Sequence, residues 1–273
     1  MRERAELAGA RRVVVKVGSS SISGENAHKI QTIVDGLAAA HARGTEVVLV
    51  SSGAIATGMP YLSLDERPVD LATQQAAAAV GQNVLIYRYQ DALRPFQIFA
   101  GQVLLTAGDL ENATHRSNAR RAMERLLGLR ILPIVNENDT VATHEIRFGD
   151  NDRLAAMVAE LIGADALVLL SDIEALYTRP PSEPGARPID TVAHDDDLSG
   201  FEFGATVVNS VGTGGAATKA SAARLAAASG IGVLVTSADL VDEALSGASI
   251  GTWFAPNPAV TPSSATAPVR TGA

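Results

Sequence analysis

Four short apolar stretches, each running directly into a polar loop, constrain the fold of this 273-residue chain more than any other feature. A segment with helical periodicity separates the first stretch from the second. A strand–helix–strand succession of this kind pairs its strands in parallel through a right-handed crossover. Because such strands are buried on both faces, they read as continuous apolar runs. The pattern therefore predicts an α/β protein with a parallel sheet. The four predicted strands cover residues 12–17, 46–50, 131–135 and 166–170.

The segments between these strands carry apolar residues at helical spacing, so we expect helices there. A Pro-, Gly- and Asp-rich segment, 177–197, is interpreted as a hairpin or lid because the α/β pattern resumes after it. We expect one domain over residues 1–257 and a disordered tail over 258–273. The expected helices cover 27–43, 70–93, 118–127, 154–162 and a segment ending at Gly230; 97–105 is expected to be extended, and closing strands are expected at 231–235 and 251–254.

Composition restricts the partners that such a domain takes. With 47% hydrophobic residues, the chain has enough apolar surface to bury a core. The net charge of −8 and the absence of a basic block argue against nucleic acid or an anionic membrane as partner. The absence of cysteine excludes disulfides and thiolate chemistry, and it is compatible with the cytoplasm. We expect no signal peptide, and no apolar run approaches the ~20 residues that span a bilayer.

Lysine is scarce, since Lys16, Lys29 and Lys219 are the only lysines among 22 basic residues. A chain that uses arginine almost everywhere draws attention to positions where a compact ammonium group is kept. Lys16 interrupts an otherwise apolar strand, so it is either a phosphate-facing ammonium or a side chain that reaches solvent at the strand end. Lys29 lies in a predicted helix and is interpreted as solvated.

Two clusters of Asn and carboxylate residues follow the strand at 131–135. The first is Asn136-Glu137-Asn138-Asp139, and the second is Gly149-Asp150-Asn151-Asp152, which we place on a loop before the next helix. Carboxylates drawn into a cleft need an opposing positive charge, so the pair favours a cationic guest such as an amine. One such cluster alone would be explained by ordinary turn formation and helix capping.

Three loops rich in glycine or serine are candidate anion-binding sites. Residues 18–21 read Gly-Ser-Ser-Ser after the first strand, and 51–53 read Ser-Ser-Gly after the second. Ser52 is either the N-cap of the next helix or an anion ligand at its N-terminus. The loop 212–219, with the pattern G-x-G-G-x-x-x-K, precedes a helix and offers backbone N–H groups and a lysine to a phosphate. It matches neither the Walker motif nor the dinucleotide fingerprint.

Together, two lysines, two cradles and an acidic pocket for an amine favour phosphoryl transfer, in which the protein mainly positions groups and neutralises charge. A carboxylate acceptor would need no general base, because its pKa of about 4.3 leaves it ionised at neutral pH. The chain offers no obvious base. Its histidines are interpreted as surface or helix-face residues: His28, His41, His115, His144 and His194.

Five motifs, in order and with compatible spacing over residues 11–257, resemble the amino-acid kinase family, and within it the kinases that phosphorylate glutamate. The resemblance implies a three-layer αβα sandwich around a mainly parallel open sheet, with a glutamate-binding lobe over 1–165 and an ATP-binding lobe over 166–257. The motifs are Val15-Lys16-Val17-Gly18-Ser19-Ser20, Val50-Ser51-Ser52-Gly53-Ala54-Ile55, Val135-Asn136-Glu137-Asn138-Asp139, Gly149-Asp150-Asn151-Asp152 and Gly212-Thr213-Gly214-Gly215 through Thr218-Lys219.

The resemblance also implies a reaction: ATP-dependent phosphorylation of the γ-carboxylate of L-glutamate, the first step of proline biosynthesis. Mg²⁺ would bind together with the nucleotide, with no metal site in the protein itself. Proline would be a feedback inhibitor. The chain would form a homo-oligomer, either a dimer or a tetramer. The implied catalytic residues are Lys16, Lys219 and Asp152. The implied glutamate-binding residues are Ser52, Asp139, Asn151, Asp150 and Asn136. The implied ATP-binding residues are Lys16, Gly18, Ser171, Asp172, Thr213, Gly214, Gly215, Ala216, Ala217, Thr218 and Lys219.

The sequence departs from the family pattern at three places. Many family members carry a further C-terminal domain of a type seen in RNA-modifying enzymes, whereas this chain ends after the kinase motifs. Residues 178–183 are unusually rich in proline, and Ala216-Ala217 replace residues that are often larger or polar. Two alternatives to a glutamate kinase stay open: a kinase for another small acid, such as aspartate or carbamate, and a non-catalytic sensor of amino acids or nucleotides.

Overall fold

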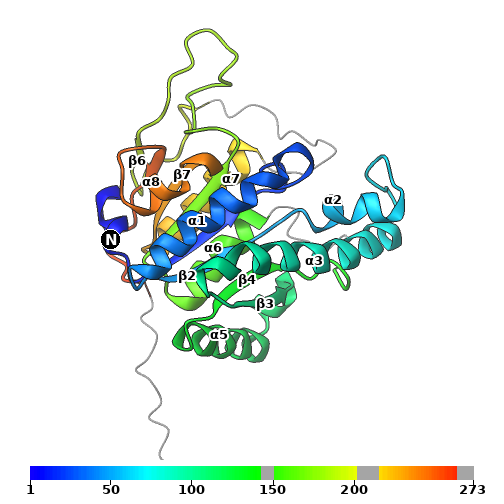
Figure 1. Cartoon of the computed structure of the whole chain (residues 1–273). Coiled ribbons are helices and arrows are strands. Elements are labelled where there is room, and N and C mark those ends of the chain that lie inside the picture. Colours follow the sequence, from blue (N-terminus) through cyan, green and yellow to red (C-terminus); the bar gives the residue numbers. More distant parts are fainter. Residues whose placement is uncertain (143–150, 202–214, 263–273) are drawn as a thin grey trace, which may run out of the picture.

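The protein is built around one eight-stranded sheet with the strand order β3-β4-β2-β1-β5-β7-β8-β6 (Figure 1). This computed structural model describes residues 1–142, 151–201 and 215–262. Within them, every neighbouring pair of strands is parallel except the antiparallel pair β7–β8. The strands are β1 (Arg12–Val17), β2 (Glu46–Val50), β3 (Ala100–Leu105), β4 (Leu132–Glu137), β5 (Ala166–Ser171), β6 (Thr191–Val192), β7 (Gly232–Ser237) and β8 (Thr252–Phe254).

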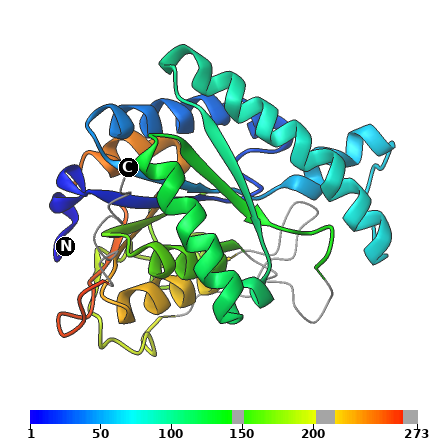
Figure 2. The ribbon, with the colours of Figure 1, turned by 90° about the horizontal axis from the view of Figure 1, so that it is seen from below.

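Helices cover both faces of the sheet, and the edge-on view in Figure 2 shows the resulting three layers. One face packs against α1, α3 and α8, and the other packs against α5, α6 and α7. The predicted three-layer αβα sandwich with a mainly parallel sheet is confirmed. The helices are α1 (Lys29–Ala42), α2 (Ala54–Gly58), α3 (Leu71–Leu93), α4 (Ala107–Glu111), α5 (Ala113–Gly128), α6 (Asn151–Ile162), α7 (Ala216–Ala228) and α8 (Val241–Leu245).

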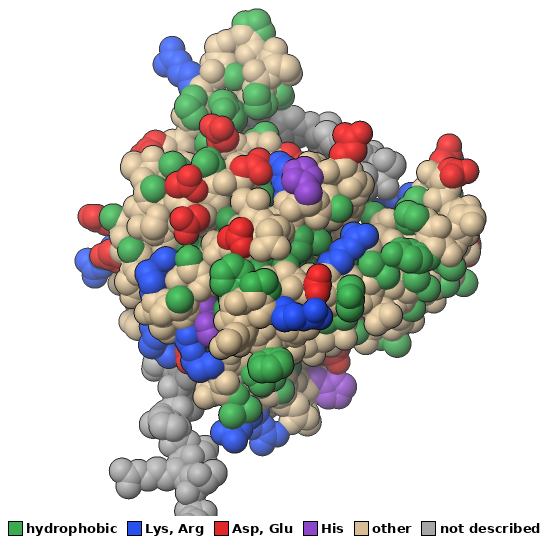
Figure 3. All heavy atoms as spheres, viewed as in Figure 1, with side chains coloured by type: hydrophobic (Ala, Val, Ile, Leu, Met, Phe, Trp, Pro, Cys, Tyr) green, Lys and Arg blue, Asp and Glu red, His purple; other side chains and the backbone are tan. Residues whose placement is uncertain are grey.

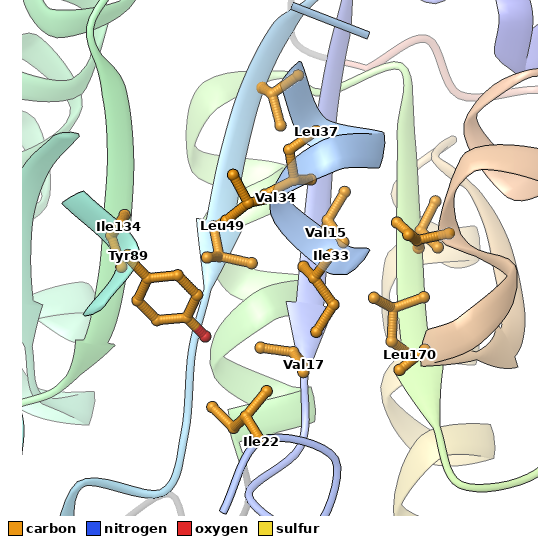
Figure 4. Close-up of a cluster of buried hydrophobic side chains, with 14 of the residues drawn as sticks. Val15, Val17, Ile22, Ile33, Val34, Leu37, Leu49, Tyr89, Ile134 and Leu170 are labelled. Carbon is orange, nitrogen blue, oxygen red and sulfur yellow. The ribbon is translucent and has the colours of Figure 1, made fainter. Parts of the chain in front are cut away.

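Alternation along the central strand β1 decides which side chains meet which helix layer. Successive side chains of a strand point to opposite faces. Val15 and Val17 therefore pack toward α1, where Ile33 and Leu37 lie one helical turn apart, as the close-up in Figure 4 shows. Val14 joins the second cluster, on the side of α6 and α7. Lys16 has the parity of Val14, so this periodicity directs its ammonium group toward α6 and α7.

Several predicted boundaries shift by a few residues. Helix α1 begins at Lys29 because residues 24–28 form a separate 3₁₀ turn. Helix α5 begins at Ala113, five residues earlier than predicted, because the Asn112 side chain accepts hydrogen bonds from two backbone N–H groups of its first turn. Helix α6 begins at Asn151, so the placement of Asn151 and Asp152 on a loop was wrong.

The Pro-rich segment after β5 forms the predicted hairpin. Tyr177 and Pro188 are partners in an isolated antiparallel bridge, and the backbone N–H of Thr178 donates to Arg187 O at 2.9 Å. The chain then rejoins the sheet as β6. Beyond β8, the N–H of Asn257 donates to Ala227 O at 2.8 Å, which holds the chain against α7 up to that point. The disordered tail over 258–273 stays a prediction.

Two glycines allow α2 and α3 to approach each other closely. A Cβ atom added at Gly58 would lie 1.9 Å from Ala77 O, and one added at Gly81 would lie 1.8 Å from Ala54 O. Both distances are far below van der Waals contact, so any side chain at either position would push the helices apart. The contact places the next residue of α3, Gln82, beside the carboxyl end of β4.

The outer surface near this helix pair is apolar. Hydrophobic side chains gather over α2 and the beginning of α3 in the space-filling view (Figure 3). Tyr61 is 60% exposed and Val69 is 90% exposed, and Leu62 lies exposed between them. Although α3 has 23 residues, neither it nor any other helix of the described residues has the length and hydropathy of a membrane span.

The close approach of α2 and α3 leads to a stability prediction. Replacing Gly81 by Ala forces the two helices apart and should lower the free energy of unfolding by ~1–3 kcal/mol, which is the usual cost of overpacking. Urea denaturation followed by circular dichroism measures the change. Gly128→Ala is the matched control, because a Cβ at Gly128 meets nothing within 4 Å and alanine favours a helix. Equal stability of the two variants would contradict the proposed steric role.

Candidate active site

Three charged side chains from three different elements meet on one side of the central strand. Lys16 extends from β1, Asp152 lies at the start of α6, and Lys219 lies in the first turn of α7. Asp152 is fully buried, and both lysines are buried as well. Lys16 Nζ contacts Asp152 Oδ1, while Lys219 Nζ donates to Asp152 Oδ2 at 3.2 Å. A single carboxylate therefore bridges two ammonium groups.

Each member of this charged triad depends on the others. A buried charge is costly unless it is paired, and a positive charge near a helix N-terminus is disfavoured by the helix dipole. Lys219 is buried in the first turn of α7, so both costs apply to it. The carboxylate of Asp152 offsets them by pairing with its ammonium group. Asp152 in turn lies at the N-terminal end of α6, where the dipole favours a carboxylate. The triad carries a net charge of +1, which suits an anionic guest.

The position of Lys16 decides between its two interpretations. Only 2% of the residue is exposed, and its ammonium group is paired with Asp152. The alternative that Lys16 reaches solvent at the strand end was therefore wrong. Lys29, interpreted as solvated, instead forms an ion pair with Asp239 at 2.7 Å, and 24% of its side chain is exposed.

Neutral polar groups lie beside the triad, at the ends of β2 and β4. Asn151 Nδ2 donates to Ser51 O at 2.7 Å, to Asn136 Oδ1 at 2.8 Å and to Ser52 Oγ at 3.1 Å. The Ser51 hydroxyl is 3.0 Å from the Tyr89 hydroxyl, and burial raises the pKa of Tyr89, against the smaller opposing effect of this hydrogen bond. These contacts bring Ser52, Asn136 and Asn151, three of the predicted glutamate-binding residues, into one group.

Ser52 does not cap the following helix. The N-cap of α2 is Gly53, with φ of +84°, and no side chain caps this helix end. A Cβ at Gly53 would lie 2.9 Å from Ser23 Oγ, so this left-handed glycine also lets the two Gly/Ser loops lie against each other. Asp139 is half-buried two residues beyond the end of β4.

The predicted nucleotide-binding residues after β5 and at the start of α7 lie on the other side of β1. Asp172, just after β5, accepts a hydrogen bond from Ser21 Oγ at 2.8 Å, which ties the loop after β1 to the end of β5. Thr218 Oγ1 accepts from the N–H of Gly215 at 3.0 Å and so orders the beginning of α7. Gly18 directly follows β1, Ser171 ends β5 at the same edge of the sheet, and Ala216 and Ala217 are the first residues of α7. Asp150, Thr213 and Gly214 lie outside the described residues, as does His144.

A cavity of about 670 Å³ runs along the exposed side of α7. Among the predicted site residues that the structure describes, Thr218 is the one that lines it, so the cavity neighbours the triad without containing it. Three of its lining side chains are basic or titratable: Arg153, His194 and Arg224. Their charge suits an anion more than an apolar guest.

Sequence reasoning missed Gln82. This side chain of α3 accepts a hydrogen bond from Asn136 Nδ2 at 2.6 Å, although 54 residues separate the two. One local signal was present, because Gly81 interrupts an alanine-rich helix, and an interior helical glycine often marks a close backbone approach. Nothing in the local sequence, however, says which strand the helix meets.

Sequence comparisons find similar proteins of known family. A model of the amino acid kinase family matches residues 11–237. A protein of Clavibacter sepedonicus named glutamate 5-kinase is 72% identical over 253 residues, covering 93% of this chain and 97% of the relative. Another glutamate 5-kinase, from Leifsonia xyli subsp. xyli, is 70% identical over 254 residues, covering 93% of this chain and 94% of the relative.

The fold comparison finds distant kinases. The structure of carbamate kinase from Giardia lamblia bound to AMP-PNP has a TM-score of 0.67. It covers 92% of this chain and 100% of its own chain. Its sequence identity is only 14%, so this likeness establishes the fold alone.

The triad leads to a second stability prediction. Asp152→Asn leaves two buried ammonium groups without their carboxylate and should lower the free energy of unfolding by ~3–5 kcal/mol. Asp239→Asn is the matched control, because it removes the carboxylate from the exposed pair with Lys29 and should cost about 1 kcal/mol or less. Urea denaturation of both variants measures the difference. A cost for Asp152→Asn no larger than for Asp239→Asn would show that the triad is not an energetically coupled unit.

Proposed function

The chain belongs to the amino acid kinase family, and we propose that it transfers the γ-phosphoryl group of ATP to the γ-carboxylate of L-glutamate. The observation that carries this proposal is the pair of buried lysines held on Asp152 at the carboxyl edge of the sheet. Open α/β sheets bind their ligands at this edge. The choice of glutamate as acceptor rests on the relatives at 70–72% identity that are named glutamate 5-kinase.

The reaction joins an oxygen of the γ-carboxylate to the γ-phosphorus of ATP. The bond from that phosphorus to the bridging oxygen breaks, and the products are glutamyl 5-phosphate and ADP. Negative charge spreads over the oxygens of the moving phosphoryl group. Lys16 and Lys219 neutralise this charge from fixed positions, because Asp152 already holds both ammonium groups. No proton has to be removed, since the acceptor carboxylate is ionised at neutral pH.

The two sides of the site take different parts of the substrates. The hydroxyl of Ser52 and the amide of Asn151 offer hydrogen bonds to glutamate, and Asp139 offers a carboxylate to its ammonium group. Ser171, Asp172 and the beginning of α7 lie on the nucleotide side. Backbone N–H groups at a helix N-terminus bind phosphate through their partial positive charge, which supports this assignment for α7.

We expect Mg²⁺ to enter this site together with the nucleotide. The described residues contain no group of three or more His, Cys, Asp or Glu side chains that could hold a metal ion. The phosphate oxygens of ATP and water molecules would supply ligands to the ion, because Mg²⁺ keeps several of its waters when it binds with a nucleotide. When bound, the ion adds positive charge on the phosphates to that of the two lysines.

Three further properties belong to the proposal because the family resemblance implies them: feedback inhibition by proline, a homo-oligomeric state and a cytoplasmic location. The exposed apolar side chains Tyr61, Leu62 and Val69 support self-association, since a large apolar patch on a monomer usually marks an interaction surface. Light scattering after size-exclusion chromatography measures the oligomeric state, and the rate at increasing proline measures the inhibition.

Trapping the product tests the reaction directly. The purified protein is mixed with ATP, Mg²⁺, hydroxylamine and one acceptor, because hydroxylamine converts an acyl phosphate into a hydroxamate. We expect hydroxamate from L-glutamate and none from aspartate or N-acetylglutamate. Product from another acid would make the chain a kinase for that acid. ATP binding without product from any acceptor would favour the alternative that the chain is a non-catalytic sensor of amino acids or nucleotides.

The catalytic role of Lys219 is tested by its removal. Lys219→Ala should lower kcat about 100-fold or more, the size of effect expected when one donor to the transition-state charge is lost. Lys29→Ala, which removes the lysine paired with Asp239, should leave kcat within about twofold. Circular dichroism shows whether both variants are folded. An unchanged kcat in folded Lys219→Ala would exclude the proposed role.

A further inference from the structure

Behind Asn151 lies a chain of side-chain amides that reaches back to helix α3. Asn151 Nδ2 donates to Asn136 Oδ1 at 2.8 Å, and Asn136 Nδ2 donates to Gln82 Oε1 at 2.6 Å. The three residues come from α6, β4 and α3. Asn136 is 1% exposed and lies between the other two, so it is shielded from solvent by its partners.

Backbone groups fix the direction of every hydrogen bond in this chain. The N–H of Glu137 can only donate, and it donates to Asn136 Oδ1 at 2.9 Å. The carbonyl oxygen of Ser51 can only accept, and it accepts from Asn151 Nδ2. Asn136 must therefore present its NH₂ group to α3, and Gln82 must present its oxygen to Asn136. Neither asparagine can rotate by 180° about its amide without losing one of these bonds.

With the amides oriented in this way, the side-chain oxygen of Asn151 is left as an acceptor for a substrate. Because its NH₂ group faces Ser51 and Asn136, Asn151 turns its own oxygen away from them. Asn151 Oδ1 is buried and has no hydrogen-bond partner among the described residues. A buried acceptor without a donor is unfavourable, because it has lost its hydrogen bonds to water. An ammonium group, which carries three N–H donors, would satisfy this acceptor, and it would also suit the carboxylate of Asp139, three residues after Asn136 in the chain.

We propose that Gln82 is a positioning residue for the amino-acid substrate. Its oxygen holds Asn136, Asn136 holds Asn151, and Asn151 Oδ1 accepts a hydrogen bond from the α-ammonium group of glutamate. Gln82 acts through these two residues and does not contact the moving phosphoryl group. This inference rests on the proposed function, and it adds that α3, through the close approach at Gly81, determines how well the ammonium group is held.

The inference predicts an effect on one substrate only. Gln82→Met keeps the length of the side chain and removes the acceptor, so it should raise the KM for glutamate about 10-fold, equivalent to the ~1.4 kcal/mol of one hydrogen bond. The KM for ATP should stay within twofold, and kcat should fall less than the KM rises. Gln82→Glu retains an oxygen at the same reach and should restore a KM for glutamate close to that of the original protein.

The matched control is Gln90→Met on the same helix. The Gln90 side chain is also hydrogen-bonded: it donates to Ile98 O and accepts from the N–H of Ala100. These bonds lie at the beginning of β3, away from the carboxyl edge of the sheet. This variant should lose stability without a change in either KM. Isothermal titration calorimetry of glutamate without ATP provides a second readout, because positioning of the ammonium group does not need the nucleotide.

Two results would overturn the inference. One is an unchanged KM for glutamate in folded Gln82→Met, and the other is an equal rise in Gln82→Glu or Gln90→Met. Failure of the proposed function is distinguishable, since the unsubstituted protein would then form no hydroxamate from glutamate at all. Active unsubstituted protein with unaffected Gln82 variants would reject only the positioning role.

Discussion

The carboxylate of Asp152, buried between two ammonium groups, is the interaction on which the rest of the site depends. A carboxylate taken out of water is costly when it is alone, and each lysine is costly without it. The three charges become acceptable only when β1, α6 and α7 meet at one edge of the sheet. Parallel pairing provides this meeting, because it brings the carboxyl ends of the strands to the same edge. The fold thus fixes two ammonium groups before any phosphate arrives.

In the proposed reaction, the strand order separates the acceptor from the nucleotide. The chain leaves β1 to form β2 on one side, and β5 pairs with β1 on the other, so β1 lies where the strand order reverses. Such switch points are the usual ligand sites of open α/β sheets. The amide chain and Ser52 lie on the side of β2 and β4, while Asp172 and α7 lie on the side of β5. Lys16, on β1 itself, stands between the acceptor side and the nucleotide side.

Local patterns in the sequence predicted the parallel α/β sheet, and they placed the candidate site motifs directly after its strands. Apolar runs such as 46–50 identify buried strands, and the Asn-rich and Gly-rich motifs follow them directly. Gln82 could not be predicted, since its role requires knowing that α3 crosses the end of β4. The early start of α6 was missed for a related reason: Asp152 reads as a turn residue until Lys16 and Lys219 are seen to surround it.

Arg12 and Lys16 show why this arginine-rich chain keeps lysine at the site. Both extend from β1 toward the same helix layer, and both are 2% exposed. At the amino edge, the guanidinium of Arg12 donates to Glu46 and, through two nitrogens, to Glu124, which uses its planar fork to fix one arrangement. At the carboxyl edge, a guanidinium group in place of Lys16 would bind the Asp152 carboxylate in one fixed geometry. It would leave few N–H donors directed at a moving phosphoryl group. An ammonium group carries three donors on a compact centre. In the proposed reaction, Lys16 can therefore stay paired with Asp152 and still direct an N–H donor toward the transferred phosphoryl group.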